Sequence, residues 1–273
     1  MNRLRLGIFG TLSFLFVATC FATEGEVSTQ LPSFWGMLFG HEGILGHYID
    51  IVYALLASIL FSVLSIKVYR NRKLIPGKLQ NFLEMCVEGM FNFLSTVLGN
   101  DAIKYTPFLG TLFFYIFINS LMGLIPGGHA PNTSLNVTAS LAIMVFLYVQ
   151  YIGFKKLGVK AYFDHLAGQP RSVASWVIAI ILIIPIHIIT EFAKPCTLAI
   201  RLWGNTKGGD ILVMAFVGLG ILILSFMHSP IGLPLQVPFI LFEIFVSAIQ
   251  ALVFTLLSTT YILMMLPAEG GHH

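Results

Sequence analysis

Long apolar stretches separated by short polar segments dominate the chain, and their lengths match helices that cross a bilayer. The stretches cover about 46–68, 105–125, 136–154, 172–227 and 235–265. A membrane-spanning helix needs about 18 or more apolar residues, and backbone groups in lipid must be hydrogen-bonded within the segment, which favours helices. The alternating segments of a membrane β-barrel are absent from the sequence. The pattern predicts an all-α polytopic membrane protein with about five membrane-embedded helices.

Two segments do not fit a simple upright span. Residues 78–99 mix apolar with charged positions, which predicts a helix lying at the inner interface; a soluble linker helix is the alternative. Residues 172–227 would measure about 80 Å as one helix, too long for one upright crossing and too short for three. We predict one long helix, tilted or bent at Pro185 and Pro195, that pairs with the last helix. Two crossings are the alternative.

The positive charges set the expected orientation. They follow the first and third apolar stretches, at Lys67, Arg70, Arg72, Lys73, Lys155, Lys156 and Lys160. Lys and Arg concentrate on the cytoplasmic side of membrane proteins, and none lies between Tyr105 and Phe154. The loop 126–135 and the N-terminus are therefore expected outside and the C-terminus in the cytoplasm. If residues 172–227 cross twice, the C-terminus lies outside instead.

The first residues predict a secretory signal. Arg3 and Arg5 precede an apolar run over 6–21, and Cys20-Phe21-Ala22 is a suitable cleavage site. We expect residues 1–22 to be a signal peptide, with a short uncleaved membrane anchor as the alternative. Residues 23–45 then form an external segment, and residues 46–273 form a single membrane domain without visible repeats.

Composition narrows the classes of function. The chain is 57% hydrophobic and only 10% charged, with a mean hydropathy of +0.88, whereas soluble domains carry about 25% charged residues. No basic patch with interleaved aromatics indicates nucleic-acid binding. The cysteines, at 20, 86 and 196, have neither disulfide nor metal spacing. Because His-Glu-x-x-His and phosphate-loop motifs are also absent, we expect no metal, no cofactor and no bound nucleotide.

Charged residues within the last two apolar stretches carry the functional signal. They are Glu191, Lys194, Arg201, Lys207, Asp210 and Glu243. A charge near the bilayer centre costs about 2.5–3.5 kcal/mol on insertion scales, so such residues are kept when they pair or take part in transport. We interpret Lys194 and Lys207 as charges near the inner surface or in a loop.

Helical spacing sorts these residues into two stripes. At about 100° per residue, Lys194, Arg201 and Asn205 lie on one face, where Gly204, Gly208 and Gly209 allow another helix to approach. Asp210, nine residues after Arg201, lies about 180° away and is not its ion-pair partner on that helix. The second stripe, on the last helix, comprises Glu243, Ser247, Gln250 and Tyr261. Two polar stripes on antiparallel helices predict a hydrated path between them.

The chemistry of the stripes indicates ion transport, above all of protons. A carboxyl group withdrawn from water can keep its proton to near neutral pH, so Asp210 and Glu243 are candidate proton carriers. Arginine cannot lose its proton, so Arg201 can hold a carboxylate ionised and block direct proton passage. We interpret His47, His129 and His228 as solvated at the interfaces, and no site is expected at the C-terminal histidines, 272 and 273.

Three other classes compete with this interpretation. A secondary transporter or another channel would normally show inverted repeats or paired broken helices. An intramembrane zinc enzyme would need the absent His-Glu-x-x-His motif. A purely structural subunit would have no reason to keep Arg201 within lipid.

The run from Lys194 to Asn205, KPCTLAIRLWGN, resembles the signature of subunit a of bacterial F-type ATP synthase. The resemblance continues through Gly208-Gly209-Asp210 and residues 243–261, covers about 40–265, and includes weaker matches at Asp50 and Asn119. Trp203 stands where the family usually has Phe, Thr206 where it has an apolar residue or Met, and Lys207 is an extra charge. The family often has Glu at position 210, and some members have His at position 243.

The resemblance implies a non-catalytic stator subunit in the bacterial cell inner membrane. Such a subunit forms two proton half-channels against a ring of c subunits carrying an essential carboxylate, and couples proton flow to ATP synthesis. It also implies b-type peripheral stalk subunits and the rest of the ATP synthase as partners. Arg201 matches the essential arginine, and Asp210, Glu243 and Gln250 match the external half-channel. Asn205 joins this set, and the secondary candidates are Asp50, Asn119, Glu191, Lys194, Ser247 and Tyr261.

Overall fold

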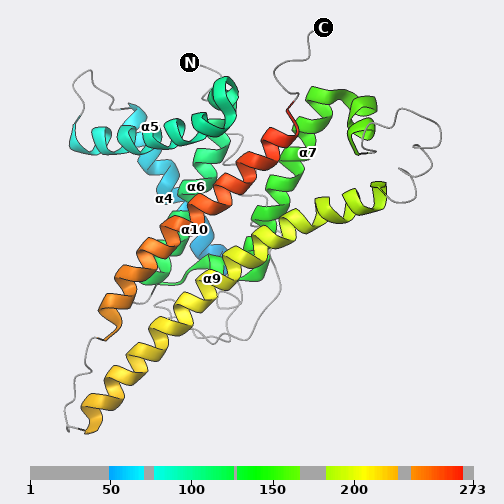
Figure 1. Ribbon diagram of the computed structural model, residues 1–273. Helices are drawn as coiled ribbons and strands as arrows, with labels where there is room; N and C mark the ends of the chain where they lie inside the picture. The colour runs from blue at the N-terminus through cyan, green and yellow to red at the C-terminus, as the bar shows by residue number, and fades with distance from the viewer. Residues whose placement is uncertain (1–48, 71–76, 126–127, 167–182, 227–234, 267–273) are drawn as a thin grey trace.

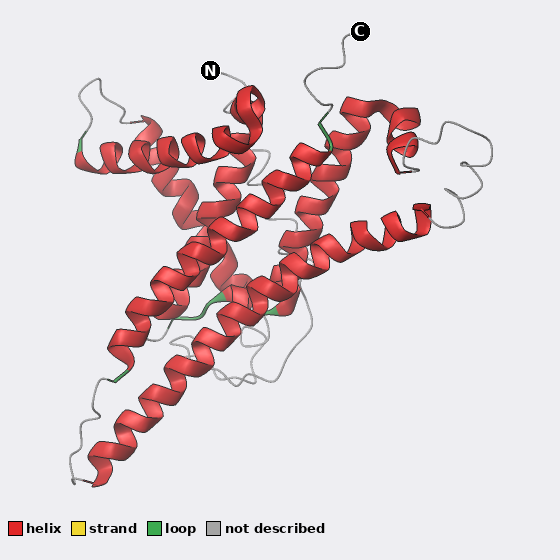
Figure 2. Ribbon diagram, viewed as in Figure 1, coloured by secondary structure: helices red, strands yellow, loops and turns green. Residues whose placement is uncertain are grey.

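The computed structural model describes residues 49–70, 77–125, 128–166, 183–226 and 235–266, and every regular element in these ranges is helical (Figure 2). The long helices are α4 (Ile49–Arg70), α5 (Lys78–Leu98), α6 (Ala102–Leu124), α7 (Leu135–Leu166), α9 (Ile184–Phe226) and α10 (Gln236–Met264). Two short 3-10 turns, η1 (Gly99–Asp101) and η2 (Pro131–Thr133), precede α6 and α7. The predicted signal peptide and external segment lie outside the described residues, so both stay predictions.

The expectation of an all-α polytopic membrane protein is confirmed. Four segments of the described residues are long and apolar enough to cross a membrane: Asp50–Arg70, Gln80–Leu124, Leu135–Lys156 and Gln236–Met264. The fifth long helix, α9, is not among these four, and the predicted number of crossings stays a prediction. The third predicted stretch agrees with the candidate span Leu135–Lys156. α7 itself continues past these lysines to Leu166 through a non-helical Gly158 with φ of 79°.

Helix α5 lies across the ends of its neighbours (Figure 1). Gly99, at a φ of 56°, ends α5 and allows the chain to turn into α6. One face of α5 buries Met90, Leu94 and Leu98 in the core, while Phe82 and Met85 on the other face are exposed. Exposed large apolar side chains favour contact with lipid over a water-soluble linker, which supports the predicted interfacial position.

Helices α9 and α10 run obliquely across the rest of the bundle (Figure 1). α9 is one uninterrupted helix of 43 residues with Pro195 inside it, so the prediction of a single long helix is confirmed over Ile184–Phe226, and Pro185 lies in its first turn. At 1.5 Å per residue it is about 65 Å long. A helix of that length must tilt to fit a hydrocarbon layer of about 30 Å. Figure 1 shows its N-terminal part turning toward the horizontal, as expected near an internal proline.

The apolar core lies where α5, α6, α7, α9 and α10 meet. Its fully buried side chains include Leu94, Leu109, Leu141, Leu202 and Phe254. α9 packs mainly against α7 and α10, and α10 packs mainly against α6. Polar residues inside α10 bond their own helix: Thr255, Ser258 and Thr259 each donate to a carbonyl one turn earlier. The core therefore fixes one face of α9 and α10 and leaves their other faces uncovered.

The segment between α6 and α7 is held against the bundle by Asn132. This side chain is fully buried, and its amide nitrogen donates to the Ile116 carbonyl at 3.1 Å and to Ser120 Oγ at 2.9 Å. The η2 turn also packs against α4, α7 and α9. The residues next to η2 are thus placed close to α9, the helix that carries Arg201 and Asp210.

Candidate functional site

Arg201 lies on the uncovered face of α9. Its neighbours Leu198 and Leu202 are buried in the core, whereas Arg201 itself and Ile200 are exposed. Among the described residues no carboxylate forms an ion pair with Arg201. A permanently charged guanidinium therefore projects from an apolar surface, where an unpaired charge is costly in a membrane.

Small residues continue the face that carries Arg201. Gly204 and Gly208 follow at helical spacing, and a Cβ atom added at either would meet nothing within 4 Å. Ala215 and Gly218 extend the exposed stripe along α9. Small residues on a membrane helix let the backbone of another helix approach closely. The surface around Arg201 is thus shaped to receive a helix.

Asp210 points away from that surface, as its spacing from Arg201 predicts. It is only partly exposed, and its electrostatic partners are His129, Lys207 and Glu243. No ion pair joins it to Arg201. The acid and the arginine therefore lie on opposite sides of α9.

Glu243 of α10 lies directly against the backbone of α9. Its side chain is buried, and a Cβ atom added at Gly209 would overlap its carboxylate. Gly209 therefore allows this approach inside the subunit, whereas Gly204 and Gly208 face outward. Asp210 and Glu243 lie close enough to interact electrostatically. Because Asp210 lies on the face opposite Arg201, this contact does not join the two predicted stripes.

The rest of the α10 stripe also faces inward. Ser247 is buried, and Gln250 is partly buried with an amide nitrogen that has no hydrogen-bond partner. On α6, Asn119 is fully buried and lies near the hydroxyl of Tyr115. Buried polar atoms without a protein partner are normally hydrated, which supports water in this part of the bundle. Asn205, predicted beside Arg201, is partly exposed on α9.

A second polar cluster surrounds Lys194, one to two turns before Arg201. Lys194 forms an ion pair with Glu191, and Gln150 of α7 donates to the same carboxylate at 3.2 Å. Tyr162 donates to Gln150 at 2.5 Å, and burial raises the pKa of Tyr162, which keeps its hydroxyl a donor. This cluster ties α9 to the second half of α7.

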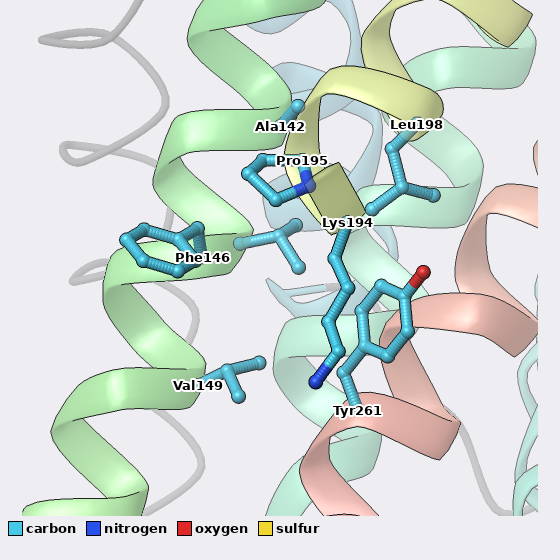
Figure 3. A pocket seen from close by; sticks show the side chains of 8 residues that line it. Ala142, Phe146, Val149, Lys194, Pro195, Leu198 and Tyr261 are labelled. Carbon is cyan, nitrogen blue, oxygen red and sulfur yellow. The ribbon is translucent and has the colours of Figure 1, made fainter. Parts of the chain in front are cut away.

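The interpretation of Lys194 and Lys207 as loop or helix-end charges is wrong. Lys194 lies within α9, its side chain is 16% exposed, and its ammonium lies 5.3 Å from the centre of the Tyr261 ring. Figure 3 shows Lys194 extending along that ring, beside a pocket lined by Pro195 and by Phe146 and other apolar residues of α7. Lys207 also lies in the interior of α9, partly buried. Pairing and cation–π contact explain how Lys194 is kept there.

We predict that removing one partner of the Lys194–Glu191 ion pair destabilises the protein more than removing both. Replacing Lys194 with Met should lower the free energy of unfolding by about 3 kcal/mol, because Glu191 is left largely buried without its cation. The double replacement Lys194→Met and Glu191→Leu should recover most of this loss. The free energies of unfolding of both variants are measured by titrating the purified subunit in mixed micelles with a denaturing detergent. A double variant as unstable as the single one would contradict this account.

His129 is not a solvated interface residue, and this interpretation is corrected. The side chain is only 5% exposed, and its Nε2 contacts the carboxylate of Asp50 at the start of α4. The ring of Tyr53 lies 5.6 Å away, centre to centre. A single histidine in a loop rich in Gly and Pro has no periodicity to reveal its burial. The signal that could have found the pair was an acid, Asp50, expected on the same side of the membrane.

Several sequence predictions fall on residues that the structure does not describe. His47, His228 and the two C-terminal histidines lie outside the described residues, as does Cys20. Cys86 and Cys196 are free thiols. In the part of the chain that the structure describes, no cluster of three or more His, Cys, Asp and Glu side chains is placed to hold a metal ion.

Comparison with known proteins gives one consistent result. The family described as "ATP synthase A chain" matches residues 51–263. The protein "ATP synthase subunit a" of Protochlamydia amoebophila (strain UWE25) is 41% identical over 247 residues, covering 88% of this chain and 91% of the relative. The protein of the same description from Geotalea daltonii is 34% identical over 222 residues, covering 81% and 88%. That of Aliarcobacter butzleri is 33% identical over 248 residues, covering 89% and 99%.

Proposed function

The chain belongs to the ATP synthase A chain family, and we propose that it is the stator of the membrane motor, forming two proton half-channels against a ring of c subunits. Membership assigns the chain to the membrane sector of the F-type complex and to its proton translocation. The finer proposal concerns which residues carry the protons and where the ring binds.

The observation that carries the proposal is the exposure of Arg201. The guanidinium has no acidic partner among the described residues, and it stands on a face lined by glycines. A ring helix bearing a carboxylate would fit this face and neutralise the charge. Arg201 would stabilise the ionised form of each arriving carboxylate, so that its proton leaves to water in the adjoining half-channel. Because the guanidinium keeps its own proton, it would also separate the two half-channels.

The inward face of α9 and α10 supplies the external half-channel. Asp210 and Glu243 lie together there, with Ser247 and Gln250 further along α10. Protons from outside would pass these groups, protonate a ring carboxylate, travel with the rotating ring and leave toward the cytoplasm on the other side of Arg201. Flow in this direction drives ATP synthesis in a separate sector. This chain would perform no covalent chemistry.

The remaining partners and the location follow from the same proposal. The chain would lie in a bacterial inner membrane with its N-terminus outside and its C-terminus in the cytoplasm. Basic residues at one end of α4 and in the middle of α7 support this orientation, namely Lys67, Arg70, Lys155 and Lys156. Peripheral stalk subunits of the b type would hold the chain against the turning ring.

Gly208→Trp tests whether the ring occupies the Arg201 face. The site is open within this chain, so the subunit should fold and enter the membrane normally. The indole should hold a ring helix away, and both co-purification with the ring and passive proton flux should fall to background. Flux is measured in vesicles stripped of the nucleotide-hydrolysing sector and driven by a potassium diffusion potential.

Ile143→Trp provides the matched control, because Ile143 is an exposed apolar residue on α7. This variant should bind the ring and conduct protons normally. If Gly208→Trp also retains the ring and its flux, the ring does not pack on this face and the proposed stator geometry is wrong.

A further inference from the structure

We propose that His129 and Asp50 form the outer entrance of the external half-channel and pass protons toward Asp210. This inference rests on the proposed function. It assigns a role to His129, which no motif marks, and it explains why a loop outside the long helices carries a buried titratable group.

Exposure decreases along the pair. The side chain of Asp50 is 32% exposed and can exchange protons with water, whereas that of His129 is 5% exposed. Nε2 of His129 contacts Oδ1 of Asp50, so a proton can move directly between them. The ring of Tyr53, tilted by 57° to the imidazole, packs beside it. The pair therefore connects water to the interior through a direct contact.

His129 lies within electrostatic reach of the candidate site. His129 interacts electrostatically with Asp210, which also interacts with Lys207 and, across the α9–α10 contact, with Glu243. These groups come from the loop after α6 and from α9 and α10, which meet around η2 and α9. No hydrogen bond among the described residues joins His129 to Asp210, so water must span that gap.

The transfer step balances as a proton relay. Asp50 takes a proton from outside water and gives it to Nε2 of the neutral ring, which becomes an imidazolium while Asp50 returns to a carboxylate. The imidazolium then releases its Nδ1 proton through water to Asp210. A flip of the imidazole between transfers restores the starting tautomer. Imidazole suits this step because its two nitrogens can accept and donate on opposite sides.

A purely structural role explains less of the geometry. The loop is already anchored by Asn132, whose amide makes two hydrogen bonds to α6. A buried residue needed only for packing would not have to be titratable, nor to touch the partly exposed acid of another helix. His129 contacts water-accessible Asp50 and lies within electrostatic reach of Asp210, as a relay requires.

The test measures passive proton flux through the complete membrane sector in liposomes, driven by a potassium diffusion potential. The His129→Gly variant should assemble with the ring of c subunits, and its proton flux should fall about tenfold or more. Free imidazole should restore flux in a dose-dependent way, relative to the same additions to liposomes carrying Ser140→Ala. His129→Asn, which keeps a hydrogen-bonding group near Asp50 but cannot carry a proton, should be as slow as His129→Gly. Ser140→Ala is the control, since Ser140 bonds only its own helix at Val137.

Two results would overturn the inference. One is an unchanged flux in His129→Asn, which would leave the histidine only a packing or hydrogen-bonding role. If His129→Gly fails to assemble, the flux of His129→Asn alone tests the inference. The other is a slow His129→Gly that imidazole does not rescue. The proposed function is tested separately, because it fails if Gly208→Trp conducts protons normally. If His129→Asn conducts normally while Gly208→Trp does not, the relay is wrong and the proposed function stands.

Discussion

Replacing Arg201 with alanine should reduce ATP-driven proton pumping by the assembled complex to the background of vesicles that lack this chain. The side chain makes no ion pair within the described residues and lies outside the core, so its removal should not disturb folding. The variant loses the fixed positive charge that, in the proposed function, ionises each ring carboxylate and separates the half-channels. Quenching of a pH-sensitive dye in vesicles carrying the whole synthase measures the pumping.

Thr197→Ala is the matched control for this experiment. Thr197 is exposed on α9 one turn before Arg201, and its hydroxyl bonds only the Ala193 carbonyl of its own helix. This variant should pump normally, and both variants should contain the chain and the ring in normal amounts. Coupled pumping at the unmodified rate by Arg201→Ala would contradict the assignment of Arg201.

Loss of both interior carboxylates should be the second large effect. Asp210→Asn and Glu243→Gln should each slow passive proton flux about tenfold, and the double variant should conduct near background, because an amide cannot relay a proton as a carboxylate does. Each change keeps the shape of its side chain, so Glu243→Gln should still fit against Gly209 and the subunit should assemble. Flux through membrane sectors under a potassium diffusion potential provides the measurement.

Glu88→Gln serves as the control for charge alone, because Glu88 is an exposed acid on α5, away from α9. It should leave flux unchanged. If the double variant conducts as fast as Glu88→Gln, then Asp210 and Glu243 do not lie on the proton path.

Helical periodicity explains why much of the fold and part of the site could be predicted. The nine-residue separation of Arg201 and Asp210 fixed their opposite faces, and the stripe from Glu243 to Gln250 did turn inward. These features depend only on the turn of one helix. Length also sufficed for the single α9, since 43 residues continue through Pro195 without a break.

Features that depend on packing between distant segments could not be predicted. His129 and Asp50 are 79 positions apart, and no local pattern joins a loop residue to the start of another helix. The burial of Lys194 was missed because the Tyr261 ring that it contacts comes from α10, and because Gln150, which bonds its partner Glu191, comes from α7. The three glycines after Arg201 looked alike in sequence, yet only Gly209 meets Glu243, because the position of α10 decides which one is covered.

A structure of the complete membrane sector, with the ring bound, would measure most directly whether Arg201 meets a mobile acid. The account predicts that its guanidinium faces the level of the ring carboxylate, with Gly204 and Gly208 against a ring helix and Asp210 turned away toward Glu243. An Arg201 side chain directed into lipid headgroups, or paired with an acid of its own subunit while the ring packs elsewhere, would contradict it.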